Sequence, residues 1–252
     1  MPKTIALDVR DRVATITLSR PEVRNAINLE MVTELHAAMD ALEARPDVHA
    51  LVLTGAGGKA FAAGADIAEL RERRRADAWK GVNGGLFARL EAFPRPTVAA
   101  IVGFALGGGC ELALACDFRV AGASSRFGQP EVGLGILAGA GGTRRLPALV
   151  GLAQARRLLF SGAIVDAGEA LRIGLVDRVV PDAEVPAAVA AWLAPILAAA
   201  PEAVRWTKAA IVARQRGATE EALQRLDVEA QGLLFEHPDK FARMDAFLAK
   251  RT

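Results

Sequence analysis

One stretch, residues 103–117, constrains the fold of this chain more than any other. It follows the apolar run 97–102, which predicts a buried strand, and it passes through Gly107, Gly108 and Gly109 into sequence typical of a buried helix. Three consecutive glycines cost backbone entropy, so we expect them where another group must approach the main chain. A strand, a glycine turn and a helix start also leave unpaired N–H groups at the positive end of the helix, where an oxyanion can bind.

Two acidic residues stand in otherwise apolar sequence. Glu111 falls in the first turn of the predicted helix, where a carboxylate can stabilise the helix N-terminus or carry out chemistry. Glu131 lies in the glycine-rich segment 129–136, and it is either hydrogen-bonded within a loop or functional. Local sequence leaves both questions open.

Composition narrows the class of protein. The chain has 252 residues, 52% of them hydrophobic, which suffices for a large core and one or two domains. Its net charge of +2 provides no strong field for nucleic acid. Cys110 and Cys116 lie six residues apart in one predicted helix, on roughly opposite faces, so we expect no disulfide and a reducing, cytoplasmic setting. Two cysteines and three scattered histidines offer no metal-ligand spacing, and we expect no metal.

We also expect neither a signal peptide nor a membrane span. The N-terminus has no long apolar run, and the alanine-rich stretch 185–200 is interrupted by Pro195.

The hydrophobic pattern divides the chain into strand–helix repeats and a helical remainder. Alternation and apolar runs predict strands at 5–9, 13–18, 48–53, 97–102 and 118–121, with the first two as a hairpin. A helix with Asn28 as its N-cap is predicted at 29–42, and further helices are predicted from 67 onward and at 83–93. A loop is predicted at 54–66 and a turn at 124–128. From Leu152 onward, three- and four-residue spacing predicts helices at 152–161, 166–173, 182–199, 201–216, 219–234 and 238–250, with an extended break at 176–180.

The loop 54–66 repeats the pattern of the opening stretch, because it connects a predicted strand through glycines to a predicted helix. Two such loops could bring N–H groups from different elements around one atom. The run 71–75, with four arginines, follows; its favoured interpretation is a solvated helix face and the alternative is contact with phosphate groups.

Several short motifs occur in series along nearly the whole chain. They are Arg20-Pro21, Asn25-Ala26, FAAGAD at 61–66, GGGCEL at 107–112, FGQPE at 127–131, GAGGTRRL at 139–146, AGEA at 167–170 and GLV at 174–176. Taken together they resemble the enoyl-CoA hydratase/isomerase family, also called the crotonase family. Agreement among many motifs in order is more specific than any one of them.

The resemblance implies an α/β fold, a crotonase-like spiral of repeated ββα units with a helical C-terminal trimerisation region. It places the catalytic core at 1–195 and the oligomerisation region at 196–252. It implies a homotrimer, with two trimers stacked as a hexamer.

The resemblance also implies an acyl-CoA thioester substrate, with no cofactor beyond the coenzyme A of the substrate. The N–H groups of Ala65 and Gly108 would form an oxyanion hole for the thioester carbonyl. Glu131 would protonate C2, Glu111 would orient and activate water, and the N–H of Gly139 would help to hold that water. Further contacts with the substrate would come from Ala63, Asp66 and Ile67, and from Phe247 and Lys250, which would reach the nucleotide of CoA in a neighbouring subunit.

Acids at both positions favour an enoyl-CoA hydratase, a lyase of fatty-acid or related acyl-CoA breakdown, over double-bond isomerisation. A non-catalytic RNA-binding relative is the remoter alternative, which the small net charge disfavours. The sequence departs from the family at two positions. Ala138 stands where the family usually has proline, so the sequence does not define the shape of the acyl pocket. Phe104 stands where family members often have tyrosine.

Overall fold

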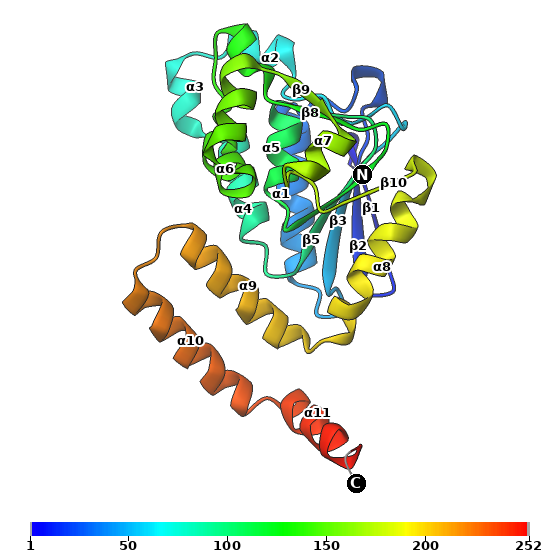
Figure 1. Ribbon diagram of the computed structural model, residues 1–252, viewed down its shortest axis with the longest axis vertical. Coiled ribbons are helices and arrows are strands. Elements are labelled where there is room, and N and C mark those ends of the chain that lie inside the picture. The colour runs from blue at the N-terminus through cyan, green and yellow to red at the C-terminus, as the bar shows by residue number, and fades with distance from the viewer. Residues whose placement is uncertain (1, 251–252) are drawn as a thin grey trace.

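The computed structural model describes residues 2–250, and their strands form two sheets (Figure 1). The larger sheet has the order β1 (Ile5–Arg10), β2 (Val13–Leu18), β3 (Ala50–Gly55), β5 (Thr97–Ile101), β7 (Phe118–Gly122) and β10 (Arg178–Val180). The predicted hairpin β1–β2 is antiparallel, and every other pair in this sheet is parallel. The smaller sheet has the order β4 (Ala60–Ala62), β6 (Phe104–Leu106), β8 (Arg126–Gly128) and β9 (Ile164–Asp166), parallel except for β9.

The chain alternates between the two sheets. It passes from β3 to β4 and then to α2 (Ile67–Glu72), from β5 to β6 and then to α5 (Gly108–Leu114), and from β7 to β8 and then to α6 (Gly142–Ser161). Each passage is one strand of the large sheet, one of the small sheet, and a helix. The expected spiral of ββα units is thereby confirmed, and its repetition brings the starts of α2 and α5 to neighbouring positions.

Helices cover both faces of the larger sheet because its parallel strands are apolar on both sides. One face packs with α1 (Leu29–Glu43), α4 (Val82–Glu91) and α5, and the other with α8 (Val185–Ala198). Along β3 the alternation is direct: Leu51 and Leu53 join the first core, whereas Val52 joins the second. As predicted, Asn28 caps α1, and its side-chain oxygen accepts a hydrogen bond of 2.9 Å from the N–H of Met31.

The chain ends in three helices, α9 (Pro201–Gln215), α10 (Glu220–Phe235) and α11 (Pro238–Ala249) (Figure 1). Helix α9 contacts the core, because Lys208 donates to Asp117 at 2.6 Å and to the carbonyl oxygen of Arg95 at 2.9 Å, whereas α10 and α11 lie farther from the sheets. Helices α9 and α10 pack on each other, whereas α11 has no buried residue. The expected division between residues 195 and 196 falls within α8 and remains a prediction. The remaining short elements are η1 (Pro21–Val23), α3 (Arg75–Lys80), η2 (Pro130–Leu134), α7 (Ala167–Arg172) and η3 (Asp182–Glu184).

None of the four strands of the small sheet was predicted from local pattern. The expected loop 54–66 contains β4, the expected turn 124–128 contains β8, β6 separates Gly103 from α5, and β9 lies between the helices predicted at 152–161 and 166–173. Each has three residues, too few to show alternation, and each exists because it pairs with strands distant in sequence. Helix α6 also begins at Gly142 rather than near residue 152, with a break at Gly151, whose φ is 75°. Helix α5 ends at Leu114, so Cys116 lies beyond it; both cysteines are free and buried, as expected.

The arginine-rich run 71–75 is solvated, as predicted, but it is not one helix face. It spans the end of α2, two non-helical residues and the start of α3. Acidic neighbours pair with it, since Glu72 lies within 4 Å of Arg71 and Arg74.

Within residues 2–250 no single helix is both long and apolar enough to cross a membrane. One pair, Asp182–Ala198 with Pro201–Gln215, passes that test jointly by length and composition, but it is bent by 105°. The same part of the chain contains no group of three or more His, Cys, Asp or Glu side chains that could hold a metal ion.

Candidate active site

Two backbone N–H groups from different ββα units meet at the start of α5. A Cβ built on Gly108 would lie 3.3 Å from the nitrogen of Ala65, so the two main chains are in contact. Gly108 is the first residue of α5, and its N–H has no partner within the helix. Among residues 2–250 no acceptor takes the N–H of Ala65 or that of Gly108. Together they form a pair of unpaired donors at a helix N-terminus.

Glycine is required for this approach. A Cβ at Gly109 would lie 2.0 Å from the carbonyl oxygen of Ala62, at the end of β4. Gly64, with φ of 115°, turns the chain between β4 and Ala65, and Gly107, with φ of 51°, turns it between β6 and α5. The glycines thus let the two strand ends present their N–H groups side by side.

Glu111 lies in the first turn of α5, and it is only 3% exposed. Its Oε1 accepts a hydrogen bond of 2.8 Å from the N–H of Gly142, the first residue of α6. The pKa of Glu111 is raised to about 7, mainly by burial. The hydrogen bond from Gly142 lowers this pKa, and the negative charge of Glu131 raises it. The side chain can therefore gain and lose a proton near neutral pH.

Glu131 lies in η2, directly after β8, and it is also buried. A Cβ on Gly107 would lie 3.0 Å from its Oε1, which places the carboxyl group beside the turn that leads to the unpaired N–H of Gly108. Turned with its nitrogen toward Glu131, the Gln129 amide donates to Oε1 at 3.1 Å and to Oε2 at 3.2 Å. Burial raises the pKa of Glu131 as well.

The two carboxyl groups belong to one site. Their charges interact, and both act, after burial, to raise the pKa of Cys110 to about 12. Two coupled acids of this kind share protons as a pair, so near neutral pH one can be protonated while the other is ionised. Beside two unpaired N–H donors, the pair can supply one proton and accept another while negative charge develops on a bound oxygen.

The structure brings together Ala65, Gly108, Glu111 and Glu131 as the sequence predicted. The roles assigned to Ala63, Asp66 and Ile67 remain predictions. Asp66 caps α2 and pairs with Arg20 at 3.1 Å, and Ile67 is 59% exposed.

Two further assignments also remain predictions. Phe247 lies in exposed α11, Lys250 follows that helix, and α11 is well separated from α2 and α5 (Figure 1). Gly139 lies in the loop before α6, and its carbonyl oxygen is close to Gly84 of α4: a Cβ built on Gly84 would lie 3.9 Å from it.

Sequence reasoning missed three residues of the site. Gly142 donates to Glu111, and the signal for it was the pair of glycines in the motif GAGGTRRL at 139–146. Gln129 contacts Glu131 from two residues away. Asn83, in α4, places its amide nitrogen 3.9 Å from the position of a Cβ on Gly108, and nothing in its local sequence indicated this. Its amide oxygen is buried without a partner in residues 2–250.

Comparisons with known proteins agree across sequence and structure. A sequence model of the family described as enoyl-CoA hydratase/isomerase matches residues 8–252. The chain is 43% identical to a short-chain-enoyl-CoA hydratase of Clostridium acetobutylicum, covering 98% of this chain and 95% of the relative. It is 41% identical to a crotonyl-CoA hydratase of Syntrophomonas wolfei, covering 99% and 96%. A crystal structure of an enoyl-CoA hydratase from Bacillus anthracis superposes with a TM-score of 0.92 at 33% identity, covering 98% of this chain and 97% of that one.

The coupling of the two acids can be measured directly. Replacing Glu131 with glutamine should lower the pKa of Glu111 from about 7, because the charge of Glu131 raises it, while burial still keeps it above its ordinary value. Carbon-13 NMR of labelled glutamate side chains follows the titration. Glu169, whose pKa Arg172 and Arg157 hold at about 2, is an internal reference that should not move. An unchanged or higher pKa of Glu111 in the variant would contradict this coupling.

Proposed function

Since this chain belongs to the enoyl-CoA hydratase/isomerase family, we propose that it adds water across the C2–C3 double bond of a trans-2-enoyl thioester of coenzyme A, giving a 3-hydroxyacyl-CoA. This is a lyase reaction of fatty-acid or related acyl-CoA breakdown. The observation that carries the proposal is the coupled pair of buried acids, Glu111 and Glu131, beside the unpaired N–H groups of Ala65 and Gly108.

The two N–H groups act on the thioester carbonyl. Addition at C3 moves electron density onto that oxygen, and two donors aimed at it stabilise the resulting enolate. Each such donor contributes roughly 3–4 kcal/mol in comparable oxyanion holes. Because Ala65 and Gly108 are main-chain donors on packed elements, they need no reorganisation as the charge develops.

The acids divide the proton transfers. Glu111, ionised, accepts a proton from water as the oxygen of that water bonds to C3. Glu131, protonated, gives its proton to C2. A proton then passes from Glu111 to Glu131, which restores the starting state with one water consumed. Because this cycle needs the coupled pair to hold one proton, its rate falls in acid, where both acids are protonated, and in base, where both are ionised.

The reaction proposed here requires no cofactor beyond the coenzyme A of the substrate. We propose that Ala63, Asp66 and Ile67, which flank the oxyanion donor Ala65, contact the thioester, and that the N–H of Gly139 helps Glu111 to hold water. A reducing, cytoplasmic setting suits both free cysteines.

We further propose a homotrimer that pairs into a hexamer. Large apolar side chains are exposed on all three C-terminal helices: Ile211, Val228, Leu233, Phe235, Phe241, Met244, Phe247 and Leu248. Apolar surface of this extent is typical of an interface between chains. In such an assembly Phe247 and Lys250 would reach the coenzyme A bound by a neighbouring subunit.

Replacing Glu131 with glutamine should lower kcat for crotonyl-CoA hydration by about three orders of magnitude, with KM changed less than threefold. The amide keeps the shape of the side chain but has no acidic proton to deliver. Loss of absorbance of the conjugated thioester measures the rate, and Glu184→Gln, on an exposed 3-10 helix, is the control. A near-normal kcat in the Glu131 variant would remove this residue from the mechanism.

Light scattering coupled to size exclusion should give the mass of three or six chains at micromolar concentration. The reason is that α11 buries none of its residues within one chain. A stable, fully active monomer under the same conditions would contradict the proposed assembly.

A further inference from the structure

The turn that positions Glu111 is itself held by an arginine. Ala140, Gly141 and Gly142 lead into α6, and the N–H of Gly142 contacts the Glu111 carboxylate. From the first turn of that helix, Arg145 Nη1 donates to the carbonyl oxygen of Ala140 at 3.0 Å. A Cβ on Gly141 would lie 2.1 Å from that same nitrogen, so the guanidinium lies directly against the backbone of the turn. The turn is therefore fixed on one side by Arg145 and presents its N–H to Glu111 on the other.

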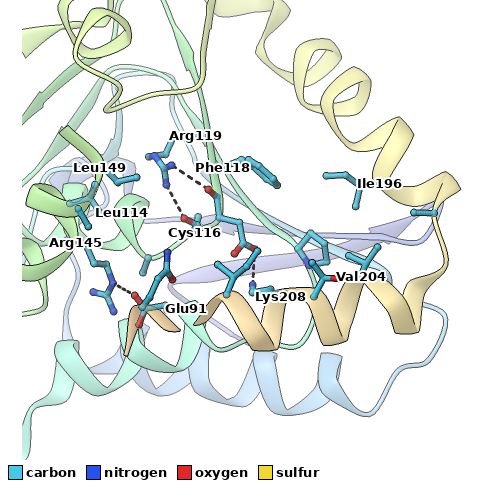
Figure 2. A pocket seen from close by; sticks show the side chains of 18 of the residues that line it. Glu91, Leu114, Cys116, Phe118, Arg119, Arg145, Leu149, Ile196, Val204 and Lys208 are labelled. Atoms are coloured by element: carbon cyan, nitrogen blue, oxygen red, sulfur yellow. Dashed lines mark hydrogen bonds and ion pairs between the residues drawn. The ribbon is translucent and has the colours of Figure 1, made fainter. Parts of the chain in front are cut away.

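Arg145 is in turn held by Glu91 from α4. Its Nε donates to Glu91 Oε1 at 2.8 Å, and the two side chains are only 4% and 10% exposed. Burial alone would raise the pKa of Glu91, but hydrogen bonds from Arg145 and Arg144 hold it below its ordinary value, so the pair is ionised. Figure 2 shows this pair at one end of a cavity of about 750 Å³ that α9 covers. Glu91 thus clamps Arg145 in the orientation that contacts Ala140.

The neighbouring Arg144 provides a natural comparison. It also pairs with Glu91, at 3.2 Å, but its side chain is 48% exposed and donates no hydrogen bond to the turn. Buried ion pairs are weak sources of net stability, because desolvation offsets their attraction. A role in orientation therefore explains the burial of Arg145 and Glu91 better than stability does.

We propose that Arg145 and Glu91 are positioning residues: their buried ion pair fixes the turn 140–142 so that the Gly142 N–H holds the Glu111 carboxylate in its working orientation. This deepens the proposed hydration and rests on it, because Glu111 is the acid that activates water. We assign neither residue a contact with the substrate.

The positive charge of Arg145 also acts on Glu111. Burial is the largest cause that raises the pKa of Glu111, and the charge of Glu131 on η2 raises it further. The charge of Arg145 on α6 lowers the pKa of Glu111. Cys110, on the same helix as Glu111, stays neutral because burial raises the pKa of its thiol to about 12. Arg145 has no comparable effect on Glu131. Loss of the Arg145 charge should accordingly raise the pKa of Glu111 and shift the acid limb of the kcat profile to higher pH.

The test compares Arg145→Gln with Arg144→Gln. We expect Arg145→Gln to lower kcat about 10- to 100-fold with KM within threefold, to move the acid limb to higher pH and to raise the pKa of Glu111 by carbon-13 NMR. Arg144→Gln should keep kcat within threefold and leave both the acid limb and the pKa in place. Indistinguishable behaviour of the two variants, or a fall in kcat without any shift in pH dependence, would overturn the proposal.

Two further measurements keep the test decisive. If Arg145→Gln does not fold, Arg145→Lys takes its place: it keeps the charge but cannot reach Glu91 and Ala140 together, so kcat should fall at least fivefold with little change in the pKa of Glu111. A fall in kcat of less than fivefold would overturn the proposal. The NMR titration needs no turnover, so a wild-type protein that hydrates no enoyl-CoA would refute the proposed function, while the titration would still decide whether Arg145 acts on Glu111.

Discussion

The site is constrained by the cost of burying two carboxyl groups whose charges interact. Burial disfavours the charged form of each acid, and the charge of one disfavours ionisation of the other. A protein retains such an arrangement only when the surrounding groups compensate for part of the cost. Here the compensation is specific: the N–H of Gly142 binds Glu111, and the amide of Gln129 faces Glu131. The same cost keeps one proton available near neutral pH, which is what an enzyme that moves protons requires.

The ββα spiral makes this arrangement possible. Each passage through the two sheets delivers a strand end, a glycine turn and a helix start to the same side of the molecule. Ala65 comes from one unit, Gly108 and Glu111 from the next, and Glu131 from the third. Side chains are absent where the units touch, because a Cβ at Gly109 would collide with the backbone of β4. Three consecutive glycines cost backbone entropy, but they allow donors and acids from separate units to meet.

Much of this was predictable from sequence, and the failures have a common physical cause. The hairpin, helix α1 with its Asn28 cap, and the pairing of two glycine loops follow from local pattern. Strands β4, β6 and β8 do not, because three-residue strands are stabilised by distant partners rather than by their own residues. Motifs in series placed Glu111, Glu131, Ala65 and Gly108 together. They could not indicate Gly142 or Arg145 as supports for Glu111, since those contacts depend on where α6 begins and how its first turn faces α5.

We propose that Glu111 activates water while Glu131 delivers the proton to C2. Two rates measured on one sample of Glu111→Ala separate these roles: hydration of crotonyl-CoA by ultraviolet absorbance, and deuterium uptake beside the thioester of a saturated acyl-CoA. We expect hydration to be abolished and exchange to be slower but to persist, because Ala65, Gly108 and Glu131 still act on that carbon. A fall of both rates by the same factor would contradict the division of labour between the two acids.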